Sequence, residues 1–496
     1  MRKRFFWISA FLILILGGMT PVPPLFAGED QDSLSSLFEG QADEWSARET
    51  EEAEILWKLG EREKALNSME RILEKQPGNL QVLGTAAAFY LGEGKTGKAK
   101  PLIETLEEKA GRTQTVLELK GDLLGQQEKW REAGETYETL LKIAPDNRRY
   151  RESYVGVLSA LRRWPEAFAL YRELLRENRK QKGLLSNYLS DLEMGASQFG
   201  TSFEYFHRPA TERNYHLRQK GSFWAAPWLR MGVGLAEDFF FKKARVLPEG
   251  THRRMVGHSL EAQFYYTRDI SFLTRWESTY YDNRDVNELD FIGEFKKGPF
   301  ESRVGYEWNV LSYDPVEALE KRGRIDRLHA NNNLTFWNRL KGGHDIAVEW
   351  YRMDASRNDM THTSYLGYKV INDFFTELIV WRNPYLSINY HYKCGVWNRA
   401  FPEAEQEIGY LPKEQAHYGG LYLEQRIGPY VDVNGSVTRG SDRKRHVDFV
   451  IWTFRGDFWL SDRAKLSCVY EYDYGDSGTA GRGNTQVFSG SVNVYF

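Results

Sequence analysis

Apolar and polar residues alternate along several long windows in the second half of the chain. In residues 255–266, 300–310 and 386–396, nearly every other residue is apolar or aromatic. Most of the residues between them are polar or charged, such as Arg303 and Glu307. A period of two over ten or more residues predicts β-strands with one apolar and one wet face. Such strands are typical of a transmembrane β-barrel, because a soluble sandwich uses shorter strands around a dry core.

Loops and turns between these windows set the expected number of strands. Counting from Trp228 to Phe496 predicts fourteen antiparallel strands, provided that Tyr365–Trp381 is one long strand. A further strand near Phe199–Phe206 leads to the alternative of sixteen, and either number is even, as in bacterial barrels. Residues Arg439–Arg445 are expected to form one of the long loops.

The N-terminus has the pattern of a secretory signal peptide over residues 1–27. The basic stretch Arg2–Arg4 precedes an apolar run over residues 5–16, and Ala27 offers a cleavage site. The run is short for a membrane span, although an uncleaved anchor helix stays the alternative. Residues 28–45 are expected to be a linker. Because no later apolar run reaches spanning length, a mature chain in a membrane must be a barrel.

The apolar pattern between residues 46 and 198 repeats every 34 residues. An alanine column recurs once per unit, and two apolar columns follow it in the same register. These columns are Ala65, Ala99, Ala133 and Ala167, then Met69, Ile103, Tyr137 and Tyr171, then Ile72, Leu106, Leu140 and Leu174. A 34-residue period with a small residue where two helices cross is the signature of tetratricopeptide repeats. It predicts four repeats over Ser46–Arg179 and a closing helix over Gly183–Gly195.

Repeats of this type stack into a solenoid whose concave face binds peptides, partner domains or polymers. We therefore expect residues 46–198 to hold a periplasmic protein partner. The charged residues between the columns have a simpler interpretation as the solvated face of the helices.

Composition narrows the classes of function. The 28 Tyr, 28 Phe and 15 Trp residues are concentrated in the C-terminal part, which suits the aromatic girdles of a barrel. A net charge of −3 gives no argument for a nucleic-acid partner. The two cysteines, Cys394 and Cys468, exclude a disulfide framework and a zinc motif, and each is expected to be a buried or lipid-facing small apolar residue.

The last strand pattern closes on a terminal phenylalanine, with Phe488, Val492 and Phe496 on one face. Such an ending resembles the signal that outer-membrane assembly machinery recognises in barrel proteins. With the leader and the alternation, it predicts an α + β two-domain chain. An N-terminal tetratricopeptide α-solenoid over residues 46–198 would lie in the periplasm, and a C-terminal antiparallel β-barrel over residues 199–496 would lie in outer-membrane lipid.

A repeat stack followed by a barrel resembles the outer-membrane exporters of secreted polysaccharides, of the poly-N-acetylglucosamine, cellulose and Pel type. The resemblance rests on domain order and repeat type, and this chain has far fewer repeats than the large exporters. It implies a porin that exports an exopolysaccharide of the kind found in biofilms, with repeats that recruit polymer or modifying enzymes. Surface-lipoprotein assembly modifiers also join a short repeat domain to a barrel, and they imply a lipoprotein substrate instead.

The polar faces of the predicted strands supply the candidate binding residues. The carboxylates expected in the lumen are Glu261, Glu277, Glu294, Glu307, Glu349, Glu377, Glu471 and Asp473, and the bases expected opposite them are Arg275, Arg303, Lys393 and Lys465. A lumen lined mostly by carboxylates favours a neutral or cationic solute, which fits a cationic amino-sugar polymer. The alternative is that these acids and bases pair with each other and only keep the lumen wet.

Catalysis is not expected. Ser387, Asn389 and His391 share one inward face and supply the residue types for nucleophilic catalysis. Strand neighbours two apart are, however, too distant for direct hydrogen bonding in most rotamers, and outer-membrane esterases place such residues toward the lipid. No metal-ligand spacing is recognisable, and no cofactor is expected.

Overall fold

The computed structural model shows two compact units, one formed by residues up to Asp191 and the other by Leu192–Phe496. The residues described are 44–178, 181–208, 212–242, 252–267, 269–281, 284–311, 323–336, 339–354, 363–399, 413–444, 447–474 and 484–496. The expected signal peptide and nearly all of the expected linker lie outside these residues. Each unit is described here by itself.

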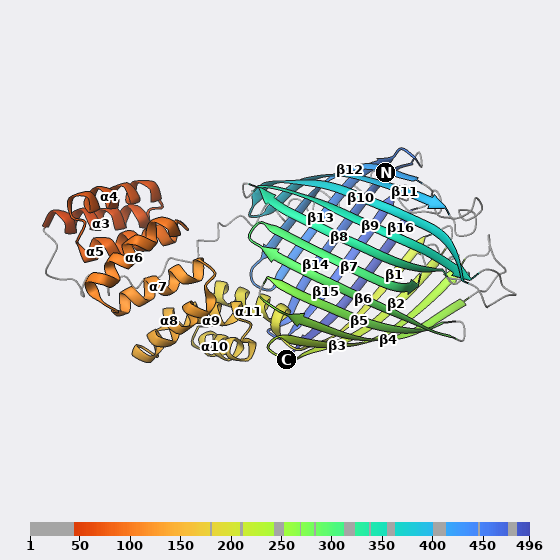
Figure 1. The fold of residues 1–496 in the computed structure, drawn as a ribbon, viewed down its shortest axis with the longest axis horizontal. Helices are drawn as coiled ribbons and strands as arrows, with labels where there is room; N and C mark the ends of the chain where they lie inside the picture. The colour runs from red at the N-terminus through yellow and green to blue at the C-terminus, as the bar shows by residue number, and fades with distance from the viewer. Residues whose placement is uncertain are drawn as a thin grey trace. The chain divides into compact units, whose positions relative to one another are not determined.

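The first unit is built from paired antiparallel helices (Figure 1). In the described residues these are α3 (Glu44–Lys58), α4 (Arg62–Lys75), α5 (Leu80–Gly92), α6 (Thr96–Ala110), α7 (Gln114–Gln126), α8 (Trp130–Ile143), α9 (Arg148–Ala160) and α10 (Trp164–Glu177), followed by α11 (Lys182–Gly195). Four helix pairs and a closing helix confirm the predicted tetratricopeptide architecture.

The three periodic columns form the core of the repeats. Every alanine of the first column has no exposed surface, and the residues of the other two columns are at most 2% exposed. The alanines lie on the second helix of each pair, where a larger side chain would separate it from its neighbours. Asn79 and Asn147 cap the N-termini of α5 and α9, because each side-chain carbonyl accepts a hydrogen bond from a backbone N–H of the first turn.

The turn inside each repeat also follows the 34-residue period. Gly60, Gly94, Glu128 and Arg162 occupy one register and all have a positive φ, between 57° and 83°. Glycine adopts this conformation without strain, whereas Glu128 and Arg162 adopt it at a cost because their Cβ atoms crowd the backbone. The periodicity of the apolar columns gave no sign of this turn residue.

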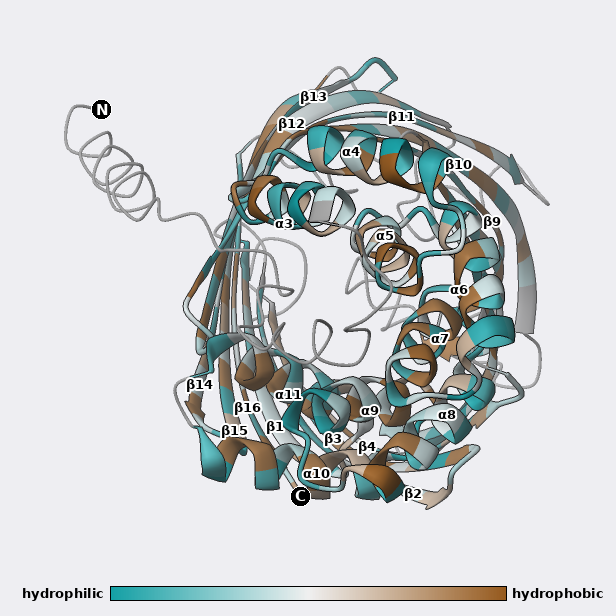
Figure 2. Ribbon diagram, turned by 90° about the vertical axis from the view of Figure 1, so that its left-hand side faces the viewer, coloured by the Kyte–Doolittle hydropathy of each residue, from teal (hydrophilic) through white to brown (hydrophobic). Residues whose placement is uncertain are grey.

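The second unit is a closed antiparallel barrel in which each strand pairs with its sequence neighbours and β1 pairs with β16 (Figures 1 and 2). The strands are β1 (Gln198–Arg208), β2 (Glu212–Ala226), β3 (Leu229–Lys242), β4 (His252–Tyr265), β5 (Ile270–Tyr281), β6 (Arg284–Lys297), β7 (Phe300–Leu311), β8 (Arg324–Phe336), β9 (Leu340–Asp354), β10 (Thr363–Arg382), β11 (Tyr385–Arg399), β12 (Lys413–Ile427), β13 (Val431–Asp442), β14 (Val447–Ser461), β15 (Ala464–Tyr474) and β16 (Thr485–Tyr495).

The barrel has sixteen strands, so the first choice of fourteen was wrong and the alternative was right. The strands from β3 to β16 do number fourteen, and Tyr365–Trp381 does lie within one long strand, β10. The count missed the hairpin of β1 and β2. Its outward face carries exposed polar residues such as Arg213 and Gln219, which interrupt the apolar alternation that marks the other strands.

A second correction concerns the connection between β13 and β14. The expected long loop at Arg439–Arg445 is mostly strand, because Gly440 pairs with Phe449 and Asp442 pairs with Val447. Asp442 has the inward parity, whereas Arg439 and Ser441 have the outward parity of Leu421, so the polarity of this segment near the end of β13 does not indicate a loop.

Beyond the hairpin of β1 and β2, the outer surface of the barrel is largely apolar. The large aliphatic residues Leu260 of β4, Val304 of β7, and Ile388 and Val396 of β11 are 47–57% exposed. Residues of alternate parity on the same strands are mostly polar and point to the other face. Wide exposure of aliphatic side chains is costly in water and favourable in lipid, so the exterior matches a bilayer. None of the helices within the described ranges is long and apolar enough to cross a membrane.

Candidate binding surface on the inner wall of the barrel

The inner wall is defined by strand parity. On β4, Val256, Leu260 and Phe264 are exposed on the outside, so Glu261 points to the lumen. The same rule, applied strand by strand against the exposed apolar residues, places all eight predicted carboxylates on the inner wall. Their part in binding a solute remains a prediction.

Five of these carboxylates form ion pairs across the wall. Lys220 reaches Glu261 at 2.7 Å by passing over Gly232, where a Cβ atom would lie 3.2 Å from the Cβ of Glu261. The other pairs are Arg303 with Glu294 at 3.7 Å, Arg327 with Glu307 at 3.1 Å and with Glu349 at 2.8 Å, and Lys341 with Glu377 at 3.3 Å. Acids and bases on the wall therefore pair to a large extent, as the alternative interpretation expects.

The remaining three predicted carboxylates have different surroundings. Glu277 lies opposite Glu288 in the register of β5 and β6. Glu471 accepts a hydrogen bond from the Thr453 hydroxyl at 3.5 Å, and Asp473 follows it on the same face of β15 with 7% of its surface exposed. Two sectors of the wall therefore have carboxylates next to each other, Glu277 beside Glu288 and Glu471 beside Asp473.

The four predicted bases lie on the same wall. Arg303 pairs with Glu294, one of the predicted carboxylates, whereas Arg275 pairs with Asp290, which is not among them. Lys465 contacts Asp457 at 3.3 Å and Glu193 at 2.9 Å, and Lys393 lies on the inward face of β11.

A buried group on β2 and β3 was missed altogether. Asp238 is 5% exposed, and its carboxylate contacts the His216 ring at 2.8 Å and the Arg218 guanidinium. The only signal in the sequence is an acidic residue just before the run of three phenylalanines that ends β3, and this signal is too weak to identify an ion-paired cluster.

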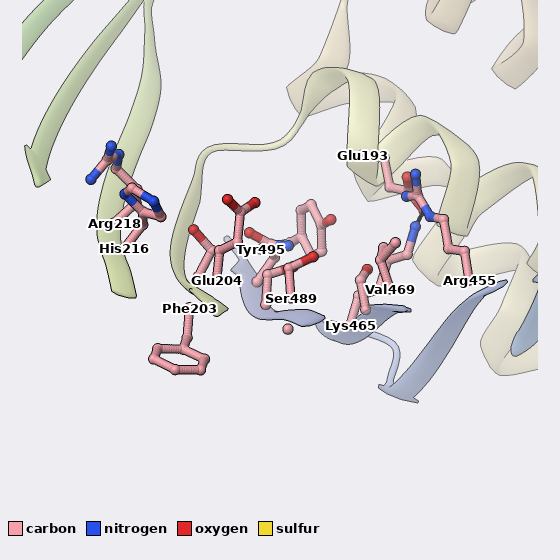
Figure 3. A pocket seen from close by; sticks show the side chains of 15 residues that line it. Glu193, Phe203, Glu204, His216, Arg218, Arg455, Lys465, Val469, Ser489 and Tyr495 are labelled. Atoms are coloured by element: carbon pink, nitrogen blue, oxygen red, sulfur yellow. Dashed lines mark hydrogen bonds and ion pairs between the residues drawn. The ribbon is translucent and has the colours of Figure 1, made fainter. Parts of the chain in front are cut away.

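A hollow of about 520 Å³ opens on the inner wall beside the closing seam of the barrel (Figure 3). Residues from β1, β2, β14, β15 and β16 line it, and Figure 3 shows Arg218 and His216 on one side and Lys465 and Arg455 near Glu193 on the other. Arg455 and Lys465 share the carboxylate of Asp457, at 3.1 and 3.3 Å. The basic groups around this hollow are therefore paired with carboxylates of the protein itself.

The last turn of α11, which belongs to the barrel unit, is fastened to this seam. The Trp224 indole donates a hydrogen bond to the carbonyl of Gly195 at 2.7 Å, and Lys465 contacts Glu193. The C-terminal carbonyls of a helix have no partner within the helix, so the indole satisfies one of them. The backbone N–H of Phe496 also donates to the carbonyl of Ser197, which joins the two ends of the barrel unit.

The three residues considered for catalysis do not assemble with each other. Ser387 has no exposed surface, and the His391 ring contacts Asp373 at 3.2 Å while stacking on Phe375 and Tyr418. Among the described residues, no group of three or more His, Cys, Asp or Glu side chains has the geometry of a metal site. Cys394 and Cys468 are both free and half-buried.

The repeats contain a second polar cluster, between α7 and α9, and it is largely buried. Glu118 forms an ion pair with Arg149 at 2.7 Å and accepts a hydrogen bond from the hydroxyl of buried Tyr150 at 3.1 Å. Burial raises the pKa of Glu118, and burial together with the nearby Glu118 carboxylate raises the pKa of Tyr150 to about 12.

The tetratricopeptide repeat family matches residues 119–181 of this chain. No curated protein matches the sequence. Among solved structures, one described as a bacterial polysaccharide outer membrane secretin is similar at 9% identity and a TM-score of 0.45, over 61% of this chain and 98% of its own.

Two further solved structures are similar to parts of the chain. A tetratricopeptide repeat protein from Parabacteroides merdae matches at 21% identity and a TM-score of 0.28, over 33% of this chain and 64% of its own. A loop-deletion mutant of the outer membrane protein OmpT of Vibrio cholerae matches at 9% identity and a TM-score of 0.32, over 60% of this chain and 98% of its own. The repeat match and the closed barrel with its apolar exterior support an outer-membrane protein that carries a tetratricopeptide repeat domain.

Proposed function

We propose that this protein exports a polysaccharide across the outer membrane, with the barrel as the conduit and the repeats as a periplasmic docking platform. The observation that carries the proposal is the inversion of polarity in the barrel, which has lipid-compatible residues outside and polar, charged residues on its inner wall. A wall of this kind suits a long hydrophilic solute, because the solute exchanges water for other polar groups as it passes. Repeats on the same chain would bring the polymer or its modifying enzymes to the entrance.

The test is deletion of the gene in the producing cell, followed by staining and quantification of the polymer at the cell surface. We expect surface polymer to disappear and to return when the full chain is supplied again. Unchanged surface polymer would contradict the proposal. The matched control is a chain with a charge change on the exposed face of a repeat, Lys64→Gln, which leaves the barrel untouched.

A second candidate function is assembly of surface lipoproteins. The small size of the helical unit favours it, since the described residues contain only four helix pairs and a closing helix. In that case deletion would remove lipoproteins from the cell surface and leave the polymer in place. Quantifying both products in the same deletion strain separates the two functions.

A further inference from the structure

Five partly exposed aromatic rings lie together on the inner wall of β10, β11 and β12. We call them the aromatic track: Phe375, Tyr385, His391, Tyr418 and Tyr422. The exposed apolar residues Leu378, Ile388 and Leu421 of the same strands have the opposite parity, so the track faces the lumen and not the lipid. The girdles expected from the sequence account for outward aromatics, and therefore they do not account for these five.

Three rings of the track overlap across neighbouring strands. Phe375 and His391 have ring centroids 5.5 Å apart with 23° between their planes, and His391 and Tyr418 have centroids 4.6 Å apart with 11° between their planes. Buried Phe449 of β14 lies behind Tyr418 at 6.1 Å. The nearly parallel rings form a continuous aromatic surface at one level of the wall.

Glycines on neighbouring strands create the space that these rings use. A Cβ atom at Gly343 would come within 2.3 Å of the Phe375 ring, and one at Gly440 would come within 2.4 Å of the Phe449 ring. Covering a strand glycine with an aromatic ring is itself a way to stabilise a barrel. This structural role alone explains why Phe375 and Phe449 are aromatic. A role in binding a ligand therefore needs evidence from the other rings of the track.

The tyrosines of the track are fixed by carboxylates. The Tyr418 hydroxyl donates to Asp373 at 2.7 Å, the Tyr385 hydroxyl to Glu377 at 2.6 Å and the Tyr422 hydroxyl to Glu424 at 2.7 Å. Each ring is thereby held in one orientation before any ligand arrives, which lowers the entropy cost of binding. A carboxylate oxygen has several acceptor positions, so each acid can accept a further hydrogen bond.

The track is elongated along the barrel. Tyr385 and His391 lie six residues apart on β11, which corresponds to about 20 Å along a strand. Tyr385 and Tyr422 form an edge-to-face pair with centroids 5.9 Å apart at one end, and the three overlapping rings form the other. Two aromatic stations separated by this distance suit a chain-like ligand better than a compact one.

From this arrangement we propose that the aromatic track binds the passing glycan chain. The apolar C–H faces of sugar rings pack on aromatic faces, and sugar hydroxyls or amines donate to Asp373, Glu377 and Glu424. Glu377 is already paired with Lys341, so Asp373 and Glu424 are the carboxylates that favour neutral or amino-bearing sugars, because an acidic glycan would place like charges beside them. The inference rests on the proposed polysaccharide export and adds the chemical class of the sugar and the residues that hold it.

The test is calorimetric titration of the detergent-solubilised full chain with two probes, the hexamers of N-acetylglucosamine and of glucosamine. We expect the wild-type chain to bind both hexamers and to bind the monomers far more weakly. Tyr385→Ala with Tyr422→Ala is expected to lower the affinity about tenfold or more, since two stacking contacts are lost. Tyr385→Phe with Tyr422→Phe keeps the rings and should retain most of the affinity.

The matched control is Tyr390→Ala, which removes a ring from the outward face of β11, where Tyr390 is 48% exposed. It should bind the hexamers as the wild type does. Heat-dependent gel mobility shows whether each variant is folded, so a folded double alanine variant with unchanged affinity overturns the track. Absence of hexamer binding by the wild type also overturns it.

The two proposals fail in different experiments. If deletion abolishes surface polymer but the chain binds neither hexamer, the track is wrong and export stands. If the hexamers bind through the tyrosines but deletion leaves the polymer in place, the track is right and polysaccharide export is wrong.

Discussion

The two units of this chain place their apolar and charged residues in opposite ways. In the repeats, apolar columns such as Leu140 and Leu174 are completely buried, and most charged residues are at the surface, with Asp191 as an exception. In the barrel, large apolar residues such as Leu260 and Val304 are half exposed, while charged residues such as Asp238 and Glu349 are buried on the inside. The difference shows that exposure of an apolar residue has no fixed cost, because the cost depends on whether water or lipid covers it.

The largest expected effect is on the water-facing unit, where the core supplies the stability. Leu140→Ala should destabilise the helical unit by about 2–5 kcal/mol, because the removed side chain leaves a cavity among packed helices. The helical circular dichroism signal of the full chain reports this unfolding. The heat-dependent gel mobility of the barrel should be unchanged, and a parallel loss of barrel stability would contradict the separation of the two units.

A matched pair of arginine substitutions tests most directly whether lipid covers the exposed apolar residues of the barrel and water covers those of the repeats. Val304 on the outer face of β7 is 50% exposed, and Ile143 at the end of α8 is 56% exposed. Val304→Arg should destabilise the barrel in lipid by about 2–4 kcal/mol, since the charge enters the bilayer. Ile143→Arg should change stability by less than about 0.5 kcal/mol, because water covers that surface. Equal effects in urea titrations of the two variants in lipid vesicles would refute the membrane interpretation.

A smaller effect is expected for ion selectivity, which depends on the charged interior. The wild-type barrel in a planar bilayer should prefer cations, with a reversal potential of the corresponding sign in a salt gradient. Glu471→Gln combined with Asp473→Asn should move that potential toward zero, because two negative charges leave one sector of the wall. Glu118→Gln removes a carboxylate from the repeats and should have no effect. Anion preference of the wild type would contradict the acidic-lumen prediction.

The smallest effect concerns a buried acid in the repeats. Asp191 is 8% exposed and accepts hydrogen bonds from Ser159 and from the Tyr171 hydroxyl at 2.8 Å. Burial raises its pKa above the ordinary value, and the two hydrogen bonds offset part of that rise. The folded state therefore holds this proton more tightly than the unfolded state.

The sign of the pH dependence follows from that difference. The free energy of unfolding contributed by Asp191 is greatest below its ordinary pKa and falls as pH rises through the raised pKa of the folded state. Asp191→Asn should be slightly more stable than the wild type at neutral pH and lose this advantage as the solution is acidified. Thermal unfolding of both proteins, followed by helical circular dichroism between neutral and acidic pH, checks the trend. An advantage that grows on acidification would contradict it.

Parts of the fold followed from particular residues. The alanine column from Ala65 to Ala167 located the second helix of each repeat, because the close packing there admits only a small side chain. The alternation around Val304 and Ile388 identified the lipid-facing strands. The hairpin of β1 and β2 entered only as the alternative with a strand near Phe199–Phe206, since its outward polar residues weaken the alternation.

The candidate site was much less accessible to sequence reasoning. The alternation of residues along each strand placed the eight carboxylates on one wall. It could not show that Lys220 reaches over Gly232 to Glu261 or that Arg275 forms an ion pair with Asp290. Such partners lie on different strands, and their distance depends on the register between strands and on the small residues that separate them.

By itself, the sequence determined the periods: 34 residues in the helical unit and two in the barrel, and hence which residues share a face. Those periods are local, since the backbone geometry of a helix or a strand sets the direction of each side chain. Only the tertiary structure decided the sixteen-stranded closure, the ion pairs of the wall and the meeting of Phe375, His391 and Tyr418. These features join residues from separate strands, and no local pattern encodes which strands become neighbours or in what register they pair.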